Sequence, residues 1–327
     1  MTRARLTATA SVLAFSAFGC SANVSASASG DVADAEASAS TAAVIIVERT
    51  VTGGGESARG EATARFLRMH TRPTIDDALR VVGANVDFPA MGKCLSLTTL
   101  GSLASLASLG SLDSPRAPEP APSVQLLDVG TVSMEANGVQ THLLARQVPD
   151  VVDLVSGVVY ARATDAELLP ARARYVLRVS GAADADPFTV TASAPSDLVE
   201  LRVGGQDAHA ITIATTASAD LTWEPGSGDD LVYVDVNATT TTATLVNGAY
   251  VRDTRDTRDT RDTRDTRNTT VRCAFGDTGR ATIAGALLPD EGTLTVHRLH
   301  RERFRARGIE SGEMRFDFAE VVAFVRR

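Results

Sequence analysis

Stretches of alternating apolar and polar residues recur every eight to twelve residues after residue 124, with turn residues between them. Tyr175, Leu177 and Val179, for example, alternate with polar neighbours, as a strand that is buried on one face requires. Asp277-Thr278-Gly279 supplies a hairpin-type turn. This spacing is typical of β-sandwiches, so we predict an all-β fold with one or two antiparallel β-sandwich (Ig-like) modules.

The predicted strands fall into two groups, which we assign to a β-rich domain at 44–203 and a β-sandwich domain at 204–327. Trp223 is expected to anchor the core of the second domain. A low-complexity insertion at 95–123 has leucine at every third position, a period that suits neither a helix nor a strand. A loop at 253–267 repeats Asp-Thr-Arg five times and has no face to bury. Both tracts fit exposed insertions, because loop-closure entropy grows only slowly with loop length.

The first nineteen residues have the features of a signal peptide. Arg3 and Arg5 give it a positive start, and Leu6–Phe18 is an apolar to small-residue stretch of thirteen positions. As a helix, this stretch would span about 20 Å, whereas the hydrocarbon core of a bilayer is about 30 Å thick. We therefore predict a signal peptide at 1–19 and export of the rest of the chain.

The residues that end the signal peptide, Ala17-Phe18-Gly19-Cys20, resemble the lipobox of bacterial lipoproteins. The resemblance implies that Cys20 is acylated and anchors the protein at the cell envelope, on the outer-membrane or periplasmic side. Ala17 and Phe18 depart from the usual leucine and small residue, and the same segment fits an ordinary cleavage site, so plain secretion stays the alternative. Residues 20–43 are rich in serine and alanine and predict a flexible tether.

The chain has three cysteines, and acylation of Cys20 leaves Cys94 and Cys273. Export makes a disulfide between them chemically permissible. Cys273 alternates with Val271 and Phe275 and therefore also fits a small buried core residue. A Cys94–Cys273 disulfide and two separate thiols both stay open.

Four arginines at alternate positions are the candidate anion-binding residues. On one strand they share one face, and this face could bind polyanions such as lipopolysaccharide phosphates. The alternative is a charged edge strand that discourages edge-to-edge association. The four residues are Arg301, Arg303, Arg305 and Arg307.

No metal site, cofactor site or catalytic residue is predicted. His297 and His300 point to opposite sides of a strand, and no third ligand accompanies them. The motifs G-x-S-x-G, S-x-x-K and H-E-x-x-H are absent from the sequence. Four acidic residues near predicted turns match no calcium-binding loop, and acids are common in turns: Glu224, Asp229, Asp230 and Asp277.

Two longer stretches, Leu221–Val236 (LTWEPGSGDDLVYVDV) and Val271–Ile283 (VRCAFGDTGRATI), resemble uncharacterised exported bacterial lipoproteins with β-sandwich (Ig-like) modules behind a tether. The resemblance covers about the last two thirds of the chain and implies an architecture without a mechanism.

Charge and composition limit the partners of the chain. A net charge of −8 gives it no general attraction to nucleic acid, so we expect no nucleic-acid partner. We predict a non-enzymatic envelope lipoprotein, structural or interaction-mediating, held at the membrane by its lipid anchor. Its other expected partners are envelope glycans or other envelope proteins. The alternatives are a carbohydrate- or ligand-binding β-sandwich module and a secreted hydrolase.

Overall fold

The computed structural model describes residues 40–53, 58–69, 86–97, 124–148, 155–183, 185–208, 210–214, 217–227, 229–238, 242–246, 249–253 and 270–327. The predicted signal peptide, Cys20 and the tether as far as residue 39 lie outside these residues. So do most of the low-complexity insertion and most of the Asp-Thr-Arg repeat. No helix in the described part of the chain has the length and apolar character to cross a membrane.

Strands dominate the described backbone, and this confirms the all-β prediction. Two short 3-10 helices, η2 (Ala166–Leu168) and η4 (Gly285–Leu287), lie between strands. The strands are β1 (Ser40–Thr52), β2 (Ala58–Met69), β3 (Lys93–Leu97), β4 (Val124–Leu126), β5 (Val132–Ala136), β6 (Val139–Val148), β7 (Val155–Asp165), β8 (Arg174–Val179), β9 (Phe188–Ser193), β10 (Arg202–Val203), β11 (Gln206–Asp207), β12 (Ala210–Ile213), β13 (Ala219–Thr222), β14 (Leu231–Ala238), β15 (Thr242–Val246), β16 (Ala249–Asp253), β17 (Thr270–Gly276), β18 (Arg280–Ile283), β19 (Glu291–Ala306) and β20 (Ile309–Arg326).

Fourteen strands form one mixed sheet in the order β3-β17-β14-β19-β20-β1-β2-β4-β7-β6-β5-β8-β9, with β12 beside β20. Most neighbours are antiparallel, but β1–β20, β12–β20 and β4–β7 are parallel. The sheet is therefore mixed where the sequence predicts antiparallel modules. Parallel neighbours need a long connection between them, and nearly the whole chain separates β1 from β20.

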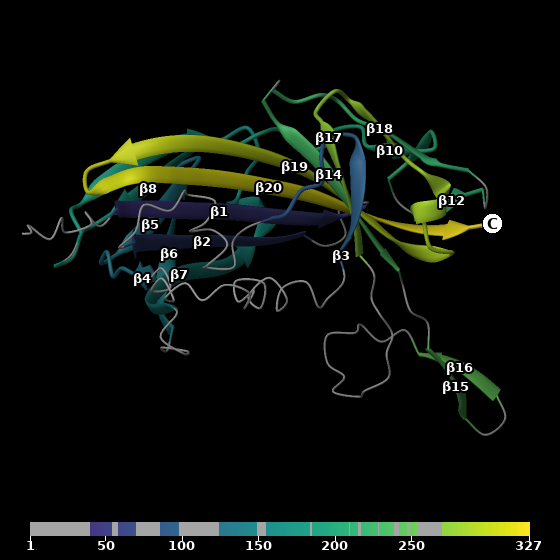
Figure 1. The fold of residues 1–327 in the computed structure, drawn as a ribbon, viewed down its shortest axis with the longest axis horizontal. Coiled ribbons are helices and arrows are strands. Elements are labelled where there is room, and N and C mark those ends of the chain that lie inside the picture. Colours follow the sequence, from purple (N-terminus) through teal and green to yellow (C-terminus); the bar gives the residue numbers. More distant parts are fainter. Residues whose placement is uncertain are drawn as a thin grey trace, which may run out of the picture. The chain divides into compact units, whose positions relative to one another are not determined.

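The hairpin of β19 and β20 is the longest feature of the sheet (Figure 1). β20 has 18 residues and therefore spans about 60 Å. The hairpin turns at Arg307-Gly308, where Gly308 has a φ of 72°, a left-handed conformation that glycine adopts readily. Even-numbered residues of β20 enter two separate hydrophobic cores in succession, so this hairpin is shared by both.

The first core lies where the sheet folds back on itself. β6 makes the corner, because Val139–Leu143 pairs with β5 and Leu144–Val148 pairs with β7. Buried side chains of β1, β2 and β20 thereby contact those of β5, β8 and β9 in one cluster. Its members include Ile45, Phe66, Val132, Tyr160, Tyr175, Leu177, Phe188, Met314 and Phe316.

The second core lies between the other end of the large sheet and a separate sheet of order β11-β10-β13-β18. Trp223, directly after β13, is buried in this core. Other members are Leu201, Val203, Ile211, Leu221, Val234, Cys273, Ile283, Val296, Val322 and Phe324. Two sandwich-like packings, joined through β19 and β20, thus form one compact unit in the described part of the chain.

Several expected boundaries differ from the observed elements. β1 begins at Ser40, inside the stretch assigned to the tether, because Ala42 and Ala43 are small enough to be fully buried. Residues 95–97 of the low-complexity insertion belong to β3, and Asp253 ends β16. Leu198, Leu201 and Val203 pack in the second core, and β20 contributes to both cores, so the packing runs across the 203/204 division. The division into two domains stays a prediction.

Candidate binding site between the two cores

Arg298 is fully buried where β19 passes from the second core towards the first. Its guanidinium donates hydrogen bonds to backbone and side chain of the segment between β9 and β10. The acceptors are Ser196 Oγ at 2.5 Å, the Asp197 carbonyl at 2.6 Å and, after β13, the Glu224 carbonyl at 2.6 Å. One charged side chain therefore fixes two loops that lie between the cores.

Asp277, directly after β17, supplies the counter-charge. Its Oδ2 lies 2.8 Å from Nε of Arg298, and both side chains are fully buried. Trp223 Nε1 donates to Oδ1 at 2.5 Å, and the Gly226 N–H donates to Oδ2 at 2.9 Å. A buried ion pair needs further hydrogen bonds to its polar atoms. Here both carboxylate oxygens and both terminal guanidinium nitrogens have such bonds, whereas Nε of Arg298 has only the ion-pair contact with Asp277. We call Arg298, Asp277 and Trp223 the junction cluster.

His300 extends the polar interior along the same face of β19. Its Nδ1 lies 2.6 Å from Oδ1 of Asp230, and Ser227 N–H donates to the other carboxylate oxygen at 3.2 Å. The hydrogen bond with Asp230 raises the pKa of His300 above its ordinary value of 6.5, although burial acts in the opposite direction. Burial by itself raises the pKa of Asp230, but hydrogen bonds with His300 and Ser227 outweigh burial, and the pKa of this carboxyl is lowered.

The His300–Asp230 pair predicts a pH-dependent stability. The pKa of His300 is higher in the folded chain than in the unfolded chain, so the folded state binds the proton more tightly. The stabilisation that protonated His300 contributes is complete below about pH 6.5, the pKa of an unperturbed histidine. It is lost as the pH rises through the higher pKa of His300 in the folded chain. Urea unfolding between about pH 5.5 and pH 8.5 should show this fall, and His300→Gln should flatten it. If the free energy of unfolding of His300→Gln falls with pH as steeply as that of the parent chain, the assignment to His300 is wrong.

A cavity of about 570 Å³ opens beside the junction cluster, and a second of about 210 Å³ adjoins it. The two share three lining residues, one of which is Asp197, whose carbonyl accepts from Arg298. The larger volume lies within the roughly 300–1,000 Å³ of typical ligand pockets. We call the two cavities together the junction cleft; its walls include Arg49, Val51, Pro170, Arg172, Asp197 and Phe318.

Arg49 and Asp197 form an ion pair inside the junction cleft. Nη2 of Arg49 lies 3.0 Å from Oδ1 of Asp197. The guanidinium carbon of Arg49 lies 5.4 Å from the ring centroid of Phe318, within the range of a cation–π contact. The cleft thus combines a fixed charge pair with apolar walls. Sequence patterns do not reveal this site, because its residues come from β1, β20, the segment between η2 and β8, and the loop after β9.

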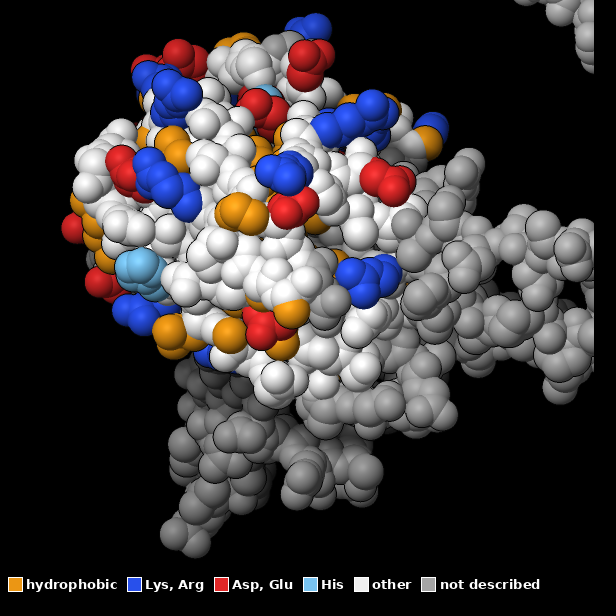
Figure 2. Space-filling model, turned by 90° about the vertical axis from the view of Figure 1, so that its left-hand side faces the viewer, with side chains coloured by type: hydrophobic (Ala, Val, Ile, Leu, Met, Phe, Trp, Pro, Cys, Tyr) orange, Lys and Arg blue, Asp and Glu red, His pale blue; other side chains and the backbone are white. Residues whose placement is uncertain are grey.

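The four predicted anion-binding arginines are all exposed. Arg301 lies 3.9 Å from the buried Glu313, and Arg307 lies 3.2 Å from Asp186. An irregularity in the pairing between Phe304 and Ala306 also interrupts the register of the hairpin within this run. Figure 2 shows the side of the molecule on which β5 and β8 lie, the left-hand side in Figure 1. Basic and acidic side chains are interspersed on this surface. Anion binding by these residues stays a prediction.

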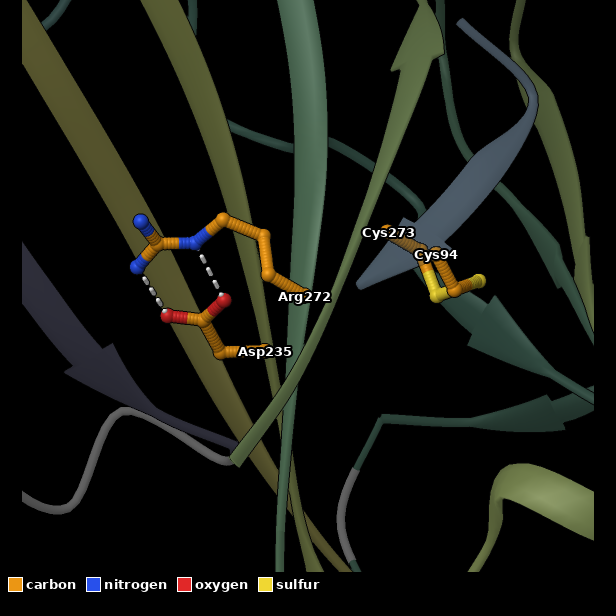
Figure 3. Close-up of a disulfide and its surroundings, with 4 residues drawn as sticks. All are labelled: Cys94, Asp235, Arg272 and Cys273. Carbon is orange, nitrogen blue, oxygen red and sulfur yellow. Dashed lines mark hydrogen bonds and ion pairs between the residues drawn. A yellow bond between two sulfur atoms is a disulfide. The ribbon is translucent and has the colours of Figure 1, made fainter. Parts of the chain in front are cut away.

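Cys94 and Cys273 are joined by a disulfide between β3 and β17 (Figure 3). The two residues are direct partners in the antiparallel pairing of these strands, with their Cα atoms 4.0 Å apart. Cys273 is fully buried in the second core, and Cys94 packs against that core. The disulfide fixes β3, a largely exposed strand, at the end of the large sheet.

The face of the sheet opposite the cores carries polar pairs. Arg272 points to this face, where its Nε and Nη2 donate to both carboxylate oxygens of Asp235 at 2.8 and 2.7 Å (Figure 3). Asp317 accepts from the hydroxyl of Tyr233 and lies 2.9 Å from Nδ1 of His297. Burial, followed by the charge of Asp317, raises the pKa of Tyr233.

His297 and His300 therefore lie on opposite faces of β19, each beside a different aspartate. Within the described residues, no three His, Cys, Asp or Glu side chains converge as metal ligands. Of the acidic residues near predicted turns, Asp230 and Asp277 turn inwards to His300 and Arg298. Cys20, the predicted lipidation site, lies outside the described residues.

No protein-family model and no curated protein matches the sequence. Among solved structures, the chain is similar to the yeast delta-COP-I mu-homology domain, with 9% identity, a TM-score of 0.21 and coverage of 88% of this chain and 97% of that chain. The same yeast domain in complex with a peptide gives 7% identity, a TM-score of 0.20 and coverage of 88% and 98%. A mutant of the CFA/I adhesin CfaE of enterotoxigenic E. coli gives 10% identity, a TM-score of 0.15 and coverage of 85% and 97%. At these TM-scores the similarities support no inference about this chain.

Proposed function

We propose that the chain is an exported, lipid-anchored envelope protein whose folded part acts by binding and not by catalysis. The Cys94–Cys273 disulfide is the observation that carries this proposal. Structural disulfides persist in oxidising compartments such as the periplasm and are rare in the reducing cytosol. A chain that carries this bond is therefore suited to an environment outside the cytoplasm.

The cysteine count also supports lipidation. The sequence has three cysteines, and the disulfide uses two of them. The third is Cys20, which directly follows the apolar stretch of the predicted signal peptide. Its position after Gly19 fits acylation, and the lipid anchor makes the membrane the first partner of the protein.

A second candidate function is that of a carbohydrate- or ligand-binding module. The junction cleft favours it, because its walls combine the Arg49–Asp197 ion pair with apolar side chains, and Arg298 holds the backbone of Asp197 in place. Envelope glycans and other envelope proteins are the partners that the proposed location offers.

The Cys20→Ser variant tests the anchor. Several acyl chains hold a protein firmly at a membrane, whereas an unacylated chain has no such attachment. We expect the wild-type protein in the envelope fraction and the variant released or stalled before processing. Cell fractionation with mass spectrometry measures both. If the variant keeps the mass and the membrane fractionation of the wild type, the protein is not anchored through Cys20.

A further inference from the structure

Arg49 is held rigidly in the junction cleft. It lies on β1, between its partners Gly60 on β2 and Phe318 on β20, so its backbone is paired on both sides. The contact of its guanidinium with the ring of Phe318 further restricts the side chain, which is 16% exposed. A guanidinium that is fixed and largely desolvated is well suited to bind a carboxylate.

The acidic partner of Arg49 is more accessible to solvent. Asp197 lies on the segment between β9 and β10, and its side chain is 45% exposed. Arg298 fixes the backbone of this residue through the Asp197 carbonyl, so the carboxylate stays at the cleft while its outer side faces water. Among the described residues, Arg49 forms its ion pair with Asp197. An arriving carboxylate could therefore replace Asp197 without disturbing β1.

A second arginine lies at the rim of the larger cavity. Arg172 has a φ of 54°, a left-handed conformation that is unfavourable for a residue with a side chain. Its N–H donates to the Pro195 carbonyl at 2.9 Å, which holds this conformation. The side chain is 64% exposed, and its contact with Glu224 is long, at 4.0 Å. Strained residues of this kind cluster at ligand sites.

We propose that the junction cleft binds a carboxylate carried on an apolar group, with Arg49 as the anchor. The ligand carboxylate takes the place of the Asp197 carboxylate on the Arg49 guanidinium. The apolar group lies against Val51, Pro170 and Val199, which line the same cavity. This inference rests on the second candidate function, ligand binding, and not on the lipid anchor. Two sources present the required chemistry, namely a peptide C-terminus with an apolar last residue and a free fatty acid.

The test uses the full chain with Cys20→Ser and calorimetric titration with three probes: N-acetyl-Ala-Ala-Leu with a free carboxylate, the same tripeptide as its amide, and octanoate. We expect the amide to bind at least about tenfold more weakly than the free acid, since a hydrogen-bonded charge is lost. Tighter binding of the tripeptide acid than of octanoate identifies a peptide C-terminus as the source, and the reverse identifies a fatty acid.

Two variants separate ligand binding from a structural role of the ion pair. Arg49→Gln should weaken binding of the acid by at least about tenfold. Asp197→Asn removes the competing carboxylate and should strengthen binding of the acid several-fold, a result that a purely structural ion pair would not give. Arg280→Gln, an exposed arginine on β18, is the matched control and should bind like the parent chain.

The proposal is overturned if neither acid binds to the parent chain or to Asp197→Asn, if acid and amide bind equally, or if Asp197→Asn weakens binding. If Arg49→Gln fails to fold, the comparison of acid with amide and the binding measured for Asp197→Asn still test whether the cleft binds a carboxylate. Fractionation of Cys20→Ser tests anchoring independently, so failure of the anchor and failure of the cleft give different results.

Discussion

Replacing both Cys94 and Cys273 with serine is expected to lower the free energy of unfolding by about 3–5 kcal/mol. The two residues are 179 positions apart, so the disulfide closes a long loop and restricts the unfolded chain strongly. β3 is a short, largely exposed strand that pairs with β17 at the edge of the sheet, and the disulfide links the two strands covalently. Urea unfolding of the double variant and of the parent chain measures the difference.

A reductant provides the matched comparison for the disulfide. The parent chain in excess dithiothreitol should approach the unfolding midpoint of the double serine variant, and the double variant should not respond. Cys20→Ser is the control substitution and should leave the midpoint unchanged, because Cys20 takes no part in the disulfide. A parent chain whose midpoint does not move on reduction would show that the disulfide contributes nothing to stability.

Asp277→Asn is expected to destabilise the chain by about 3–5 kcal/mol, because it leaves the charge of Arg298 buried without a counter-charge. Both side chains of this pair are fully buried, so water cannot replace the lost carboxylate. Trp223, the one tryptophan of the chain, donates to Asp277, so its fluorescence reports both the local change and unfolding.

Asp220→Asn is the matched control for Asp277→Asn. Asp220 lies on β13 and accepts from Thr282 at 2.8 Å in an exposed position. Exposed polar contacts contribute little, so its substitution should change the free energy of unfolding by less than about 1 kcal/mol. If both substitutions change the free energy of unfolding by the same amount, the junction cluster does not stabilise the fold in the way described.

The sequence predicts the all-β fold because strand alternation is a local property. A run such as Tyr175, Leu177 and Val179 shows its buried face without knowledge of its partners, and all three residues lie in the first core. Sheet order is not local. The parallel pairing of β1 with β20 joins residues such as Val44 and Glu313, and no local pattern specifies which distant strand a given strand meets.

Sequence patterns do not decide between a disulfide and two separate thiols, for a related reason. Bridging depends on the register of β3 against β17, which places Cys94 opposite Cys273. β3 is mostly exposed and lacks a clear alternating pattern, so sequence analysis finds no strand around Cys94. Cys273 lies in a clearly alternating strand, and this alternation predicts its buried position.

The junction cluster and the junction cleft cannot be predicted from the sequence, because their residues resemble residue types that are common at the surface. Asp277 and Asp230 resemble ordinary turn acids, and Arg298 resembles one of many arginines on a charged strand. Their burial follows from the place where β19 crosses between two cores. Arg49 and Asp197 are 148 positions apart and meet only because the loop after β9 returns to β1.

Non-reducing peptide mapping by mass spectrometry, on protein isolated from the envelope of the cells that make it, tests the proposed export and anchoring most directly. The account predicts an N-terminal peptide that begins at an acylated Cys20 and a peptide pair cross-linked through Cys94 and Cys273. A chain that still begins at Met1 and carries three reduced cysteines would contradict it.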